Sequence, residues 1–174
     1  VDEVIALVQA LQTVGYSPDA LYTAQGGQIE FQQALGDAAE AILIHSVWSP
    51  LADFSGVLAG EEYSNATFVA NYEAAAGTPP DEDEAIPFAV CQGVEQAIIG
   101  TGGTDNAALS EWLHSRTADD PVKTILGDFV WDERGLPADK SFLVNQWQSG
   151  ELEFVFPVGE FPGTVDLIYP KPEW

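Results

Sequence analysis

The segment from Ala20 to Pro50, ALYTAQGGQIEFQQALGDAAEAILIHSVWSP, holds the clearest structural pattern in the chain. A short apolar strand over 20–24 leads through the glycine turn Gln25-Gly26-Gly27 into an amphipathic helix over 29–35. A nearly continuous apolar strand follows at 41–48, of the kind that is buried on both faces of a parallel sheet. Strand, helix and strand in this order predict a βαβ unit.

The flanking sequence continues the alternation of helices and strands. Helices are predicted at 1–14, 65–77, 85–99 and 105–113, and strands at 124–131, 142–148 and 151–156. The helix over 85–99 has apolar residues on more than one face and is expected to be largely buried. Residues 49–62, rich in small side chains, are expected to form a loop. The chain is therefore predicted to be α/β, with antiparallel strands in its carboxyl-terminal region.

The composition excludes one large class of functions. The 174 residues are 46% hydrophobic, which is sufficient for a globular core, and carry 28 acidic against 5 basic side chains, a net charge of −23. Such a field repels phosphate backbones and anionic lipid headgroups, so nucleic-acid binding is not expected. An acidic surface of this kind is typical of proteins in salty or extracellular surroundings.

No residue pattern predicts an enzyme or a metal site. Cys91 is the single cysteine and no Cys/His cluster has metal-ligand spacing, so neither a metal nor another cofactor is expected. His45 and His114 are interpreted as structural residues, and Ser46 lacks the Gly-x-Ser-x-Gly pattern of a nucleophile elbow. No apolar run approaches the roughly 20 residues of a membrane-spanning helix. Because the chain lacks methionine and begins within a predicted helix, we expect it to be part of a longer protein.

Two places in the βαβ unit are candidate ligand contacts. Gln25 and Gly26 follow a strand and precede a helix, where backbone N–H groups collect anions, although such a turn is most often only a turn. No GK[ST] follows, which argues against a nucleotide site. Trp48 leaves the second strand at the end where open α/β sheets bind ligands, and it fits a core aromatic equally well.

Several strings resemble a known family when they are taken together in their order and spacing. They are Leu35-Gly36-Asp37-Ala38-Ala39-Glu40, Phe68-Val69-Ala70-Asn71-Tyr72, Gly77-Thr78-Pro79-Pro80, Phe88-Ala89-Val90, Thr101-Gly102-Gly103-Thr104-Asp105, Thr124-Ile125-Leu126-Gly127-Asp128-Phe129, Trp131-Asp132-Glu133-Arg134-Gly135, Asn145-Gln146-Trp147-Gln148-Ser149-Gly150 and Tyr169-Pro170-Lys171-Pro172-Glu173-Trp174. The set resembles the carboxyl-terminal half of type I periplasmic solute-binding proteins of the Leu/Ile/Val-binding kind, which deliver ligands to ABC importers.

The resemblance implies a two-lobed fold of parallel sheets flanked by helices, with a hinge between the lobes and the ligand in the cleft. Residues 1–48 would belong to the second lobe, 49–140 to the first, and 141–174 to the second again. The amino-terminal half of the protein would be missing. We therefore expect the chain to associate either with that half or with a second copy of itself.

The resemblance also indicates which residues face the ligand. In amino-acid-binding relatives, the loop after the strand that matches 20–24 presents an acidic residue to the ligand's ammonium group, and the matching residue here is the neutral Gln25. An unpaired buried ammonium is costly, so an amide, a polyol or an aromatic or aliphatic carboxylate is favoured over an amino acid. Asp83, next to the start of a helix, is a further candidate cleft residue, although its acidic neighbours favour a solvated helix entry.

These observations predict a non-enzymatic solute-binding protein of an ABC uptake system. Its partners would be a small-molecule ligand and the membrane permease, and its location would be periplasmic or extracellular, with a lipid anchor in the full-length form. Two alternatives remain open, namely a sensor domain of the same fold in a receptor or regulator, and an α/β enzyme.

Overall fold

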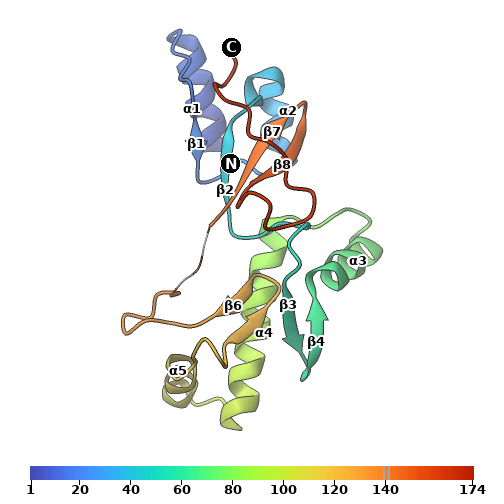
Figure 1. The fold of residues 1–174 in the computed structure, drawn as a ribbon, viewed down its shortest axis with the longest axis vertical. Helices are drawn as coiled ribbons and strands as arrows, with labels where there is room; N and C mark the ends of the chain where they lie inside the picture. Colours follow the sequence, from blue (N-terminus) through green and yellow to red (C-terminus); the bar gives the residue numbers. More distant parts are fainter. Residues whose placement is uncertain (139, 141) are drawn as a thin grey trace. The chain divides into compact units, whose positions relative to one another are not determined.

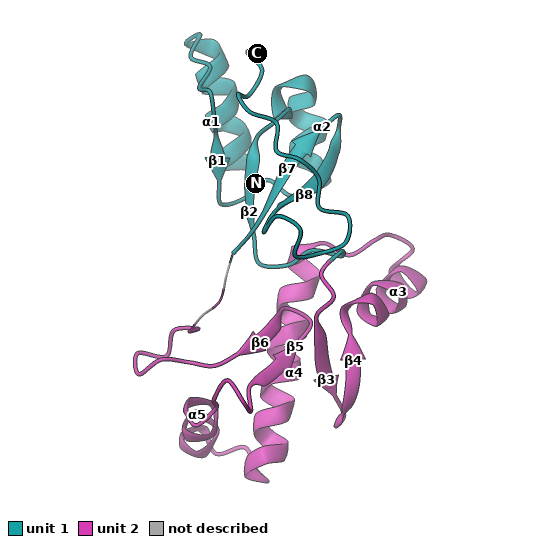
Figure 2. Ribbon diagram, viewed as in Figure 1, with its two compact units in different colours: residues 1–51, 142–174 teal, residues 52–141 magenta. Residues whose placement is uncertain are grey.

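The computed structural model describes residues 1–138, 140 and 142–174. The chain divides into two compact units, shown in different colours in Figure 2. Unit 1 comprises residues 1–51 and 142–174, and unit 2 comprises residues 52–141. Each unit has its own secondary structure and its own packing, and each is described by itself below.

Unit 1 is built around a four-stranded sheet with the strand order β1-β2-β7-β8 (Figure 1). The elements of this unit are α1 (Asp2–Thr13), β1 (Tyr22–Thr23), α2 (Ile29–Leu35), the 3-10 helix η1 (Gly36–Ala39), β2 (Leu43–Ser46), β7 (Leu143–Gln148) and β8 (Glu151–Phe156). β1 and β2 are parallel, whereas β7 is antiparallel to β2 and β8 is antiparallel to β7. The βαβ unit and the antiparallel carboxyl-terminal strands therefore form one mixed sheet.

The helices of unit 1 bury their apolar faces on this sheet. Val8 of α1 and Phe31 of α2 meet Ile44 of β2 and Trp147 of β7 in one cluster, and all four side chains are almost completely buried. The rings of Phe31 and Trp147 are stacked, with 6.4 Å between their centroids. Removing this much apolar surface from water is the main stabilising contribution in a small domain. The core therefore joins the first and last parts of the sequence.

The carboxyl-terminal tail packs back on unit 1 through hydrogen bonds. The amide side chain of Gln146 donates to the carbonyl of Ile168 at 3.0 Å and accepts from its N–H at 2.9 Å. The indole N–H of Trp174 donates to the carbonyl of Tyr16 at 3.2 Å. The Lys171 ammonium lies 3.7 Å from the Trp174 ring centroid, and burial lowers the pKa of this lysine. The tail thus fastens the turn after α1.

Unit 2 contains three helices and two hairpins among its described residues. They are β3 (Ser55–Leu58), β4 (Glu61–Ser64), α3 (Asn65–Ala76), α4 (Glu82–Thr101), α5 (Asn106–His114), β5 (Val122–Thr124) and β6 (Gly127–Phe129). β3 pairs with β4 and β5 with β6, both antiparallel. Side chains cap two of the helices: the Ser64 hydroxyl accepts from the Thr67 N–H, and the Asp105 carboxylate accepts from the Ala108 N–H.

Two glutamines of α4 join this helix to the hairpins. Gln92 is fully buried; its amide donates to the Val57 carbonyl at 3.2 Å and accepts from the Ile125 N–H at 2.9 Å. Gln96 accepts from the N–H of Lys123 and donates to its carbonyl. A buried amide requires such partners, so these side chains fix the position of β3 and β5 against the helix.

The predicted loop over 49–62 is wrong. It contains β3 and the first residues of β4, joined by a two-residue turn at Ala59 and Gly60 with φ of 54° and 80°. Two positive φ values are typical of a hairpin turn, and the small side chains of this segment concealed the strand pattern.

The single strand predicted over 124–131 is also wrong, because the chain turns at Ile125 and Leu126 to form the β5–β6 hairpin. The Thr124 hydroxyl closes this turn by accepting from the Leu126 N–H and donating to the Gly127 carbonyl. Hydrogen bonds from a side-chain hydroxyl to nearby backbone groups compete with those of a continuous strand. Because the turn residues Ile125 and Leu126 are apolar and buried, the sequence pattern gave no sign of the turn.

Two predictions of burial need correction. β2 shows alternating burial, since Ile44 and Ser46 are buried while Leu43 and His45 are half-buried. α4 buries Ala85, Ala89, Gln92 and Ala97, but several of its apolar side chains on other faces are exposed. An apolar helix or strand has faces that other parts of a protein can cover, but which of them are covered depends on the contacts. In this chain, one face of β2 and one face of α4 are covered.

In the described part of the chain, no helix combines the length and apolarity needed to cross a bilayer.

Candidate functional site

The first candidate site lies at one edge of the sheet of unit 1. Because β1 and β2 are parallel, the loops that follow Thr23 and Ser46 leave the sheet at the same edge. Leu143, at the start of β7, pairs with Ser46, so β7 begins at this edge as well. Carboxyl ends of parallel strands are the usual position of ligand contacts in α/β proteins.

Gly26 has a structural role in this loop. Its carbonyl accepts a 2.8 Å hydrogen bond from the Trp147 indole, and its φ is 118°. A Cβ at this position would lie 3.0 Å from the Phe31 ring and 3.2 Å from Ile44. A glycine is therefore required here, because the backbone of the loop lies directly against the core side chains Phe31 and Ile44. This agrees with the interpretation of the turn as a structural one.

Gln25 is exposed in the same loop. Its side-chain oxygen accepts from the amino nitrogen of Val1 at 3.3 Å, and its carbonyl accepts from the Thr23 hydroxyl at 2.8 Å. Thr23 itself is buried. The Thr23 hydroxyl thus fixes the backbone of Gln25 at the carboxyl end of β1.

Trp48 is buried and follows β2 by two residues. The Ser46 hydroxyl donates to the Trp48 carbonyl at 2.5 Å and lies 3.2 Å from the Trp48 N–H. Ser49 is also buried, and its hydroxyl accepts from the Leu51 N–H. These hydrogen bonds hold the backbone of the segment that follows β2 in one conformation.

The structure therefore places Gln25, Gly26 and Trp48 on the two loops at one sheet edge. Thr23 and Ser46, the last residues of β1 and β2, lie at the same edge, and the hydroxyl of each is bonded to the backbone of the loop that follows. A small hydroxyl residue at the end of an apolar strand is the sequence signal for both. His45 is on the same strand as Ser46. Its Nδ1 lies 2.7 Å from the Tyr22 hydroxyl oxygen, and its ring is tilted by 56° against that of Phe142, with 4.5 Å between the ring centroids.

Asp83 belongs to unit 2, in the first turn of α4, and its side chain is exposed. Asp81 precedes the helix and accepts from the Asp83 N–H at 2.7 Å, while the Glu84 carboxylate accepts from the Asp81 N–H at 2.9 Å. This arrangement is a capping box, which satisfies amide groups at the helix start. The acidic run therefore opens a helix, as its composition indicated.

The capping box predicts a pH dependence for unit 2. Burial raises the pKa of Asp81 from 3.8 to about 6; the Asp83 amide opposes this rise, and the neighbouring Glu84 carboxylate adds to it. Since the folded pKa is raised, the stabilisation from this group is fully present below pH 3.8 and is lost as the pH rises through about 6. We expect the urea midpoint of unit 2 to rise when the pH is lowered from 7 to 5.

Asp81→Asn is the matched control, because the amide oxygen still accepts from the Asp83 N–H but does not titrate in this range. The variant should have a weaker pH dependence between about pH 4 and 6. Equal slopes for the variant and the unmodified protein would show that other carboxylates, such as Glu84, account for the dependence.

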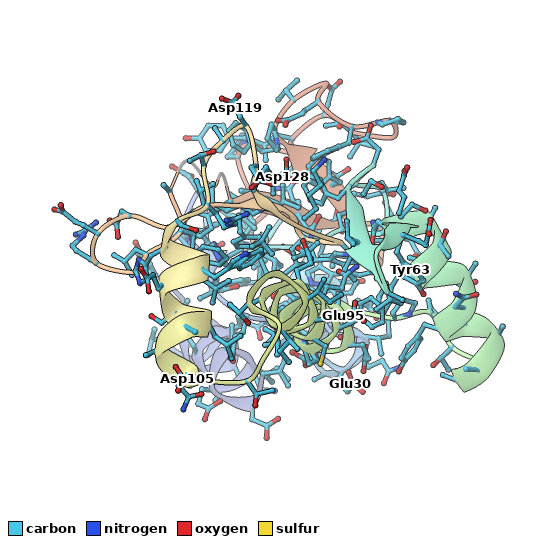
Figure 3. The ribbon with its side chains drawn as sticks, turned by 90° about the horizontal axis from the view of Figure 1, so that it is seen from below. Glu30, Tyr63, Glu95, Asp105, Asp119 and Asp128 are labelled. Carbon is cyan, nitrogen blue, oxygen red and sulfur yellow. The ribbon has the colours of Figure 1, made fainter. Side chains whose placement is uncertain are left out.

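The remaining charge is spread over the surface. Figure 3 shows the carboxylates of Asp105 and Asp119 directed away from the ribbon. Arg116 pairs with Asp120 and Arg134 with Asp132, in each case between residues close in sequence. The side chains of Asp105 and Asp119 are therefore exposed to water.

No protein-family model matches this chain. A curated amino acid binding protein of Pseudomonas aeruginosa is 32% identical to it over 73 residues, which are 42% of this chain and 18% of that protein.

Among solved structures, the chain is similar to a leucine-binding protein from Thermotoga maritima, with a TM-score of 0.68 and 22% identity over 88% of this chain and 41% of that one. An extracellular ligand-binding receptor from Rhodopseudomonas palustris has a TM-score of 0.67 and 19% identity over 87% of this chain and 44% of that one. A putative branched-chain amino acid ABC transporter from Silicibacter pomeroyi has a TM-score of 0.62 and 15% identity, and the match covers 99% of this chain and 45% of that one.

These matches confirm the α/β fold and the resemblance predicted from the sequence. The names of the matched proteins describe binding or transport, and none of those given above is the name of an enzyme. The chain spans less than half the length of each of them.

Proposed function

We propose that this chain, which has the fold of type I periplasmic solute-binding proteins, is the carboxyl-terminal part of a binding protein for an ABC uptake system. The observation that carries the proposal is the structural match over 88% of the chain to a leucine-binding protein, at a TM-score of 0.68. The local match to an amino acid binding protein supports the same function from the sequence. Binding without chemical conversion of the ligand is the activity that we propose.

Units 1 and 2 are proposed to belong to the second and first lobes of such a protein. Their boundaries, at residues 51/52 and 141/142, lie close to the crossings inferred from the resemblance. In this proposal a small ligand is held between the lobes, and Gln25, Gly26 and Trp48 from unit 1 and Asp83 from unit 2 are its candidate contacts. Closure of the lobes around the ligand would then be recognised by the membrane permease.

The ligand class is proposed from Gln25. A neutral amide at this position forms hydrogen bonds but does not balance the charge of a buried ammonium group. We therefore favour a neutral amide, a polyol or an aromatic or aliphatic carboxylate over an α-amino acid.

The test is a thermal-shift screen of the complete gene product against leucine, isoleucine, valine, neutral amides, polyols and aromatic carboxylates. A ligand that binds only the folded state stabilises it by about 2.7 kcal/mol at a concentration 100 times its Kd. Stabilisation by one class without turnover supports solute binding. Failure of every class to shift the unfolding temperature contradicts it, and micromolar binding of leucine would contradict only the inference from Gln25.

Gln25→Glu tests the role of this residue by calorimetry. The added carboxylate is expected to improve leucine binding and to weaken the binding of carboxylate ligands, because it supplies the charge that an ammonium requires. Gln33→Glu adds the same charge on the exposed surface of α2 and is the matched control. Identical effects of the two substitutions would remove Gln25 from the proposed site.

The extracytoplasmic location, the lipid anchor and the permease partner belong to this proposal as well. A sensor domain is the second candidate, because the match from Rhodopseudomonas palustris is described as an extracellular ligand-binding receptor. Loss of solute uptake on deletion of the gene, measured with radiolabelled ligand, distinguishes the transport role from the sensor role.

A further inference from the structure

Lys140 is the last described residue of unit 2 before the chain returns to unit 1. Its ammonium nitrogen lies over two aromatic rings, 5.0 Å from the ring centroid of Phe54 and 4.5 Å from that of Phe129. It also donates to the Leu126 carbonyl. A cation over the face of an aromatic ring is attracted by the negative face of the ring, and more strongly where water is excluded. These partners belong to two other parts of the unit, the segment over 52–54 and the β5–β6 hairpin.

The β5–β6 hairpin leaves room for this side chain at Gly127. The φ of Gly127 is 94°, which few residues other than glycine adopt. A Cβ at this position would lie 2.7 Å from the Lys140 Nζ and 3.3 Å from the Phe54 ring. Any larger residue would therefore push the ammonium away from the Leu126 carbonyl and the ring. The backbone of the hairpin and the lysine fit closely together.

Phe54 belongs to the other segment where the chain passes between the units, since unit 2 begins at Ala52. The buried side chain of Asn65 donates to the Ala52 carbonyl at 2.8 Å, and the Asn65 N–H donates to the Phe54 carbonyl at 2.9 Å. The start of α3 thus fixes the backbone of 52–54, while Lys140 contacts the ring. Within unit 2, the two crossing segments meet through one side chain.

In unit 1, backbone hydrogen bonds join the same two parts of the chain. β2 precedes the first crossing and β7 follows the second, and the two strands are antiparallel, with Ser46 opposite Leu143 at this end of the ladder. A ladder of backbone bonds holds neighbouring strands at a fixed spacing. The crossing segments are therefore held together at both ends, by the β2–β7 ladder in unit 1 and by Lys140 in unit 2.

The charge of Lys140 is retained at a cost in hydration. Burial lowers the pKa of this lysine, and the nearby Asp128 carboxylate opposes the shift. An apolar side chain of similar length would fill the same space without this cost, so packing alone does not require an ammonium here. The two ring faces and the Leu126 carbonyl do require one, because each of them attracts a cation.

We propose that Lys140 is a positioning residue of the connection between the units, which holds the two crossing segments together on the side of unit 2. In the proposed solute-binding function, bending during closure of the lobes is thereby confined to the residues between Lys140 and the β2–β7 ladder. That consequence rests on the proposed function, whereas the role of Lys140 in joining the segments does not.

Lys140→Met in the complete gene product tests this role, because it keeps the length of the side chain and removes its charge. Amide hydrogen exchange, measured by mass spectrometry without any ligand, reports local opening of residues 52–58. We expect exchange there to become about tenfold faster, because the Phe54 ring loses the cation that holds it against the hairpin. Lys123→Met removes the same charge at an exposed position of β5 and is expected to change this rate by less than about twofold.

Phe54→Leu shows whether Lys140 acts through the ring, since it removes the ring and keeps an apolar side chain. In this background, Lys140→Met is expected to have little further effect on exchange over 52–58, so the two substitutions are strongly non-additive. Rate increases that multiply independently would overturn the proposal, and so would equal rates in Lys140→Met and Lys123→Met.

The distribution of the effect separates positioning from general stabilisation. A residue that only stabilises unit 2 would, when replaced, accelerate exchange evenly through the unit, including α3, and that result would also overturn the proposal. Because no ligand is present in these measurements, a failure here is distinguishable from a failure of solute binding.

Discussion

Trp147→Ala is expected to lower the free energy of unfolding of unit 1 by about 3–5 kcal/mol, the usual cost of truncating a buried aromatic side chain. Trp147 is 3% exposed and stacks on Phe31 in the cluster that joins α1, α2 and the sheet. Its indole also donates to the Gly26 carbonyl at 2.8 Å, so the substitution leaves a buried carbonyl without this partner. Urea unfolding followed by far-ultraviolet circular dichroism measures the change.

Trp147→Phe separates the two contributions. Phenylalanine keeps much of the stacking on Phe31 but has no N–H, so we expect a smaller loss of about 1–3 kcal/mol from the unsatisfied carbonyl and the reduced packing. Hydrogen exchange in the loop around Gly26 should become faster in both variants. An alanine variant as stable as the phenylalanine variant would contradict the proposed role of the aromatic packing.

Gly56→Ala is expected to destabilise unit 2 by about 3 kcal/mol through overpacking and the loss of buried hydrogen bonds. A Cβ on Gly56 would lie 2.6 Å from the Gln92 amide nitrogen and 2.8 Å from the backbone Cα and carbonyl carbon of Thr124. The backbone of β5 is held by its own hairpin, so β3 must move away from it. That movement breaks the bond from Gln92 to Val57.

Gly93→Ala is the matched control in the same unit. A Cβ on Gly93 would lie 3.6 Å from a methyl group of Val122, an ordinary contact distance, and alanine is more favourable than glycine in a helix interior by about 1 kcal/mol. We therefore expect this second Gly-to-Ala substitution to stabilise unit 2 slightly. Thermal unfolding of both variants checks the prediction, and the same sign for both would contradict the close approach of β3 to β5.

The helices and their ends were the most predictable part of the fold. The helix predicted over 29–35 is α2, and Ser64 and Asp105, residue types that favour helix caps, accept hydrogen bonds at the starts of α3 and α5. A helix and its caps depend on residues that lie within a few positions of one another, so a short stretch of sequence is sufficient to predict them. The hairpin turns at 59–60 and 125–126 were missed because small or buried side chains hid them from the same local reasoning.

The candidate site was predictable only in outline. A parallel β1–β2 pair implies that the residues after each strand share an edge, which selects Gln25 and Trp48 without a structure. The role of Gly26 was not accessible in this way, because its partner Trp147 is 121 residues away.

The sequence by itself therefore determined the α/β class, the acidic surface and the presence of the helices, which follow from composition and short-range spacing, and its motifs carried the resemblance to solute-binding proteins. The boundaries of α4 (Glu82–Thr101) differ from the predicted 85–99 at both ends. Only the tertiary structure decided which face of α4 is buried, since the helix is apolar on two sides and Gln92 selects one of them through bonds to β3 and to the β5–β6 turn. It also decided that Gly26 supports the core, because contacts between distant segments depend on the packing of the whole unit.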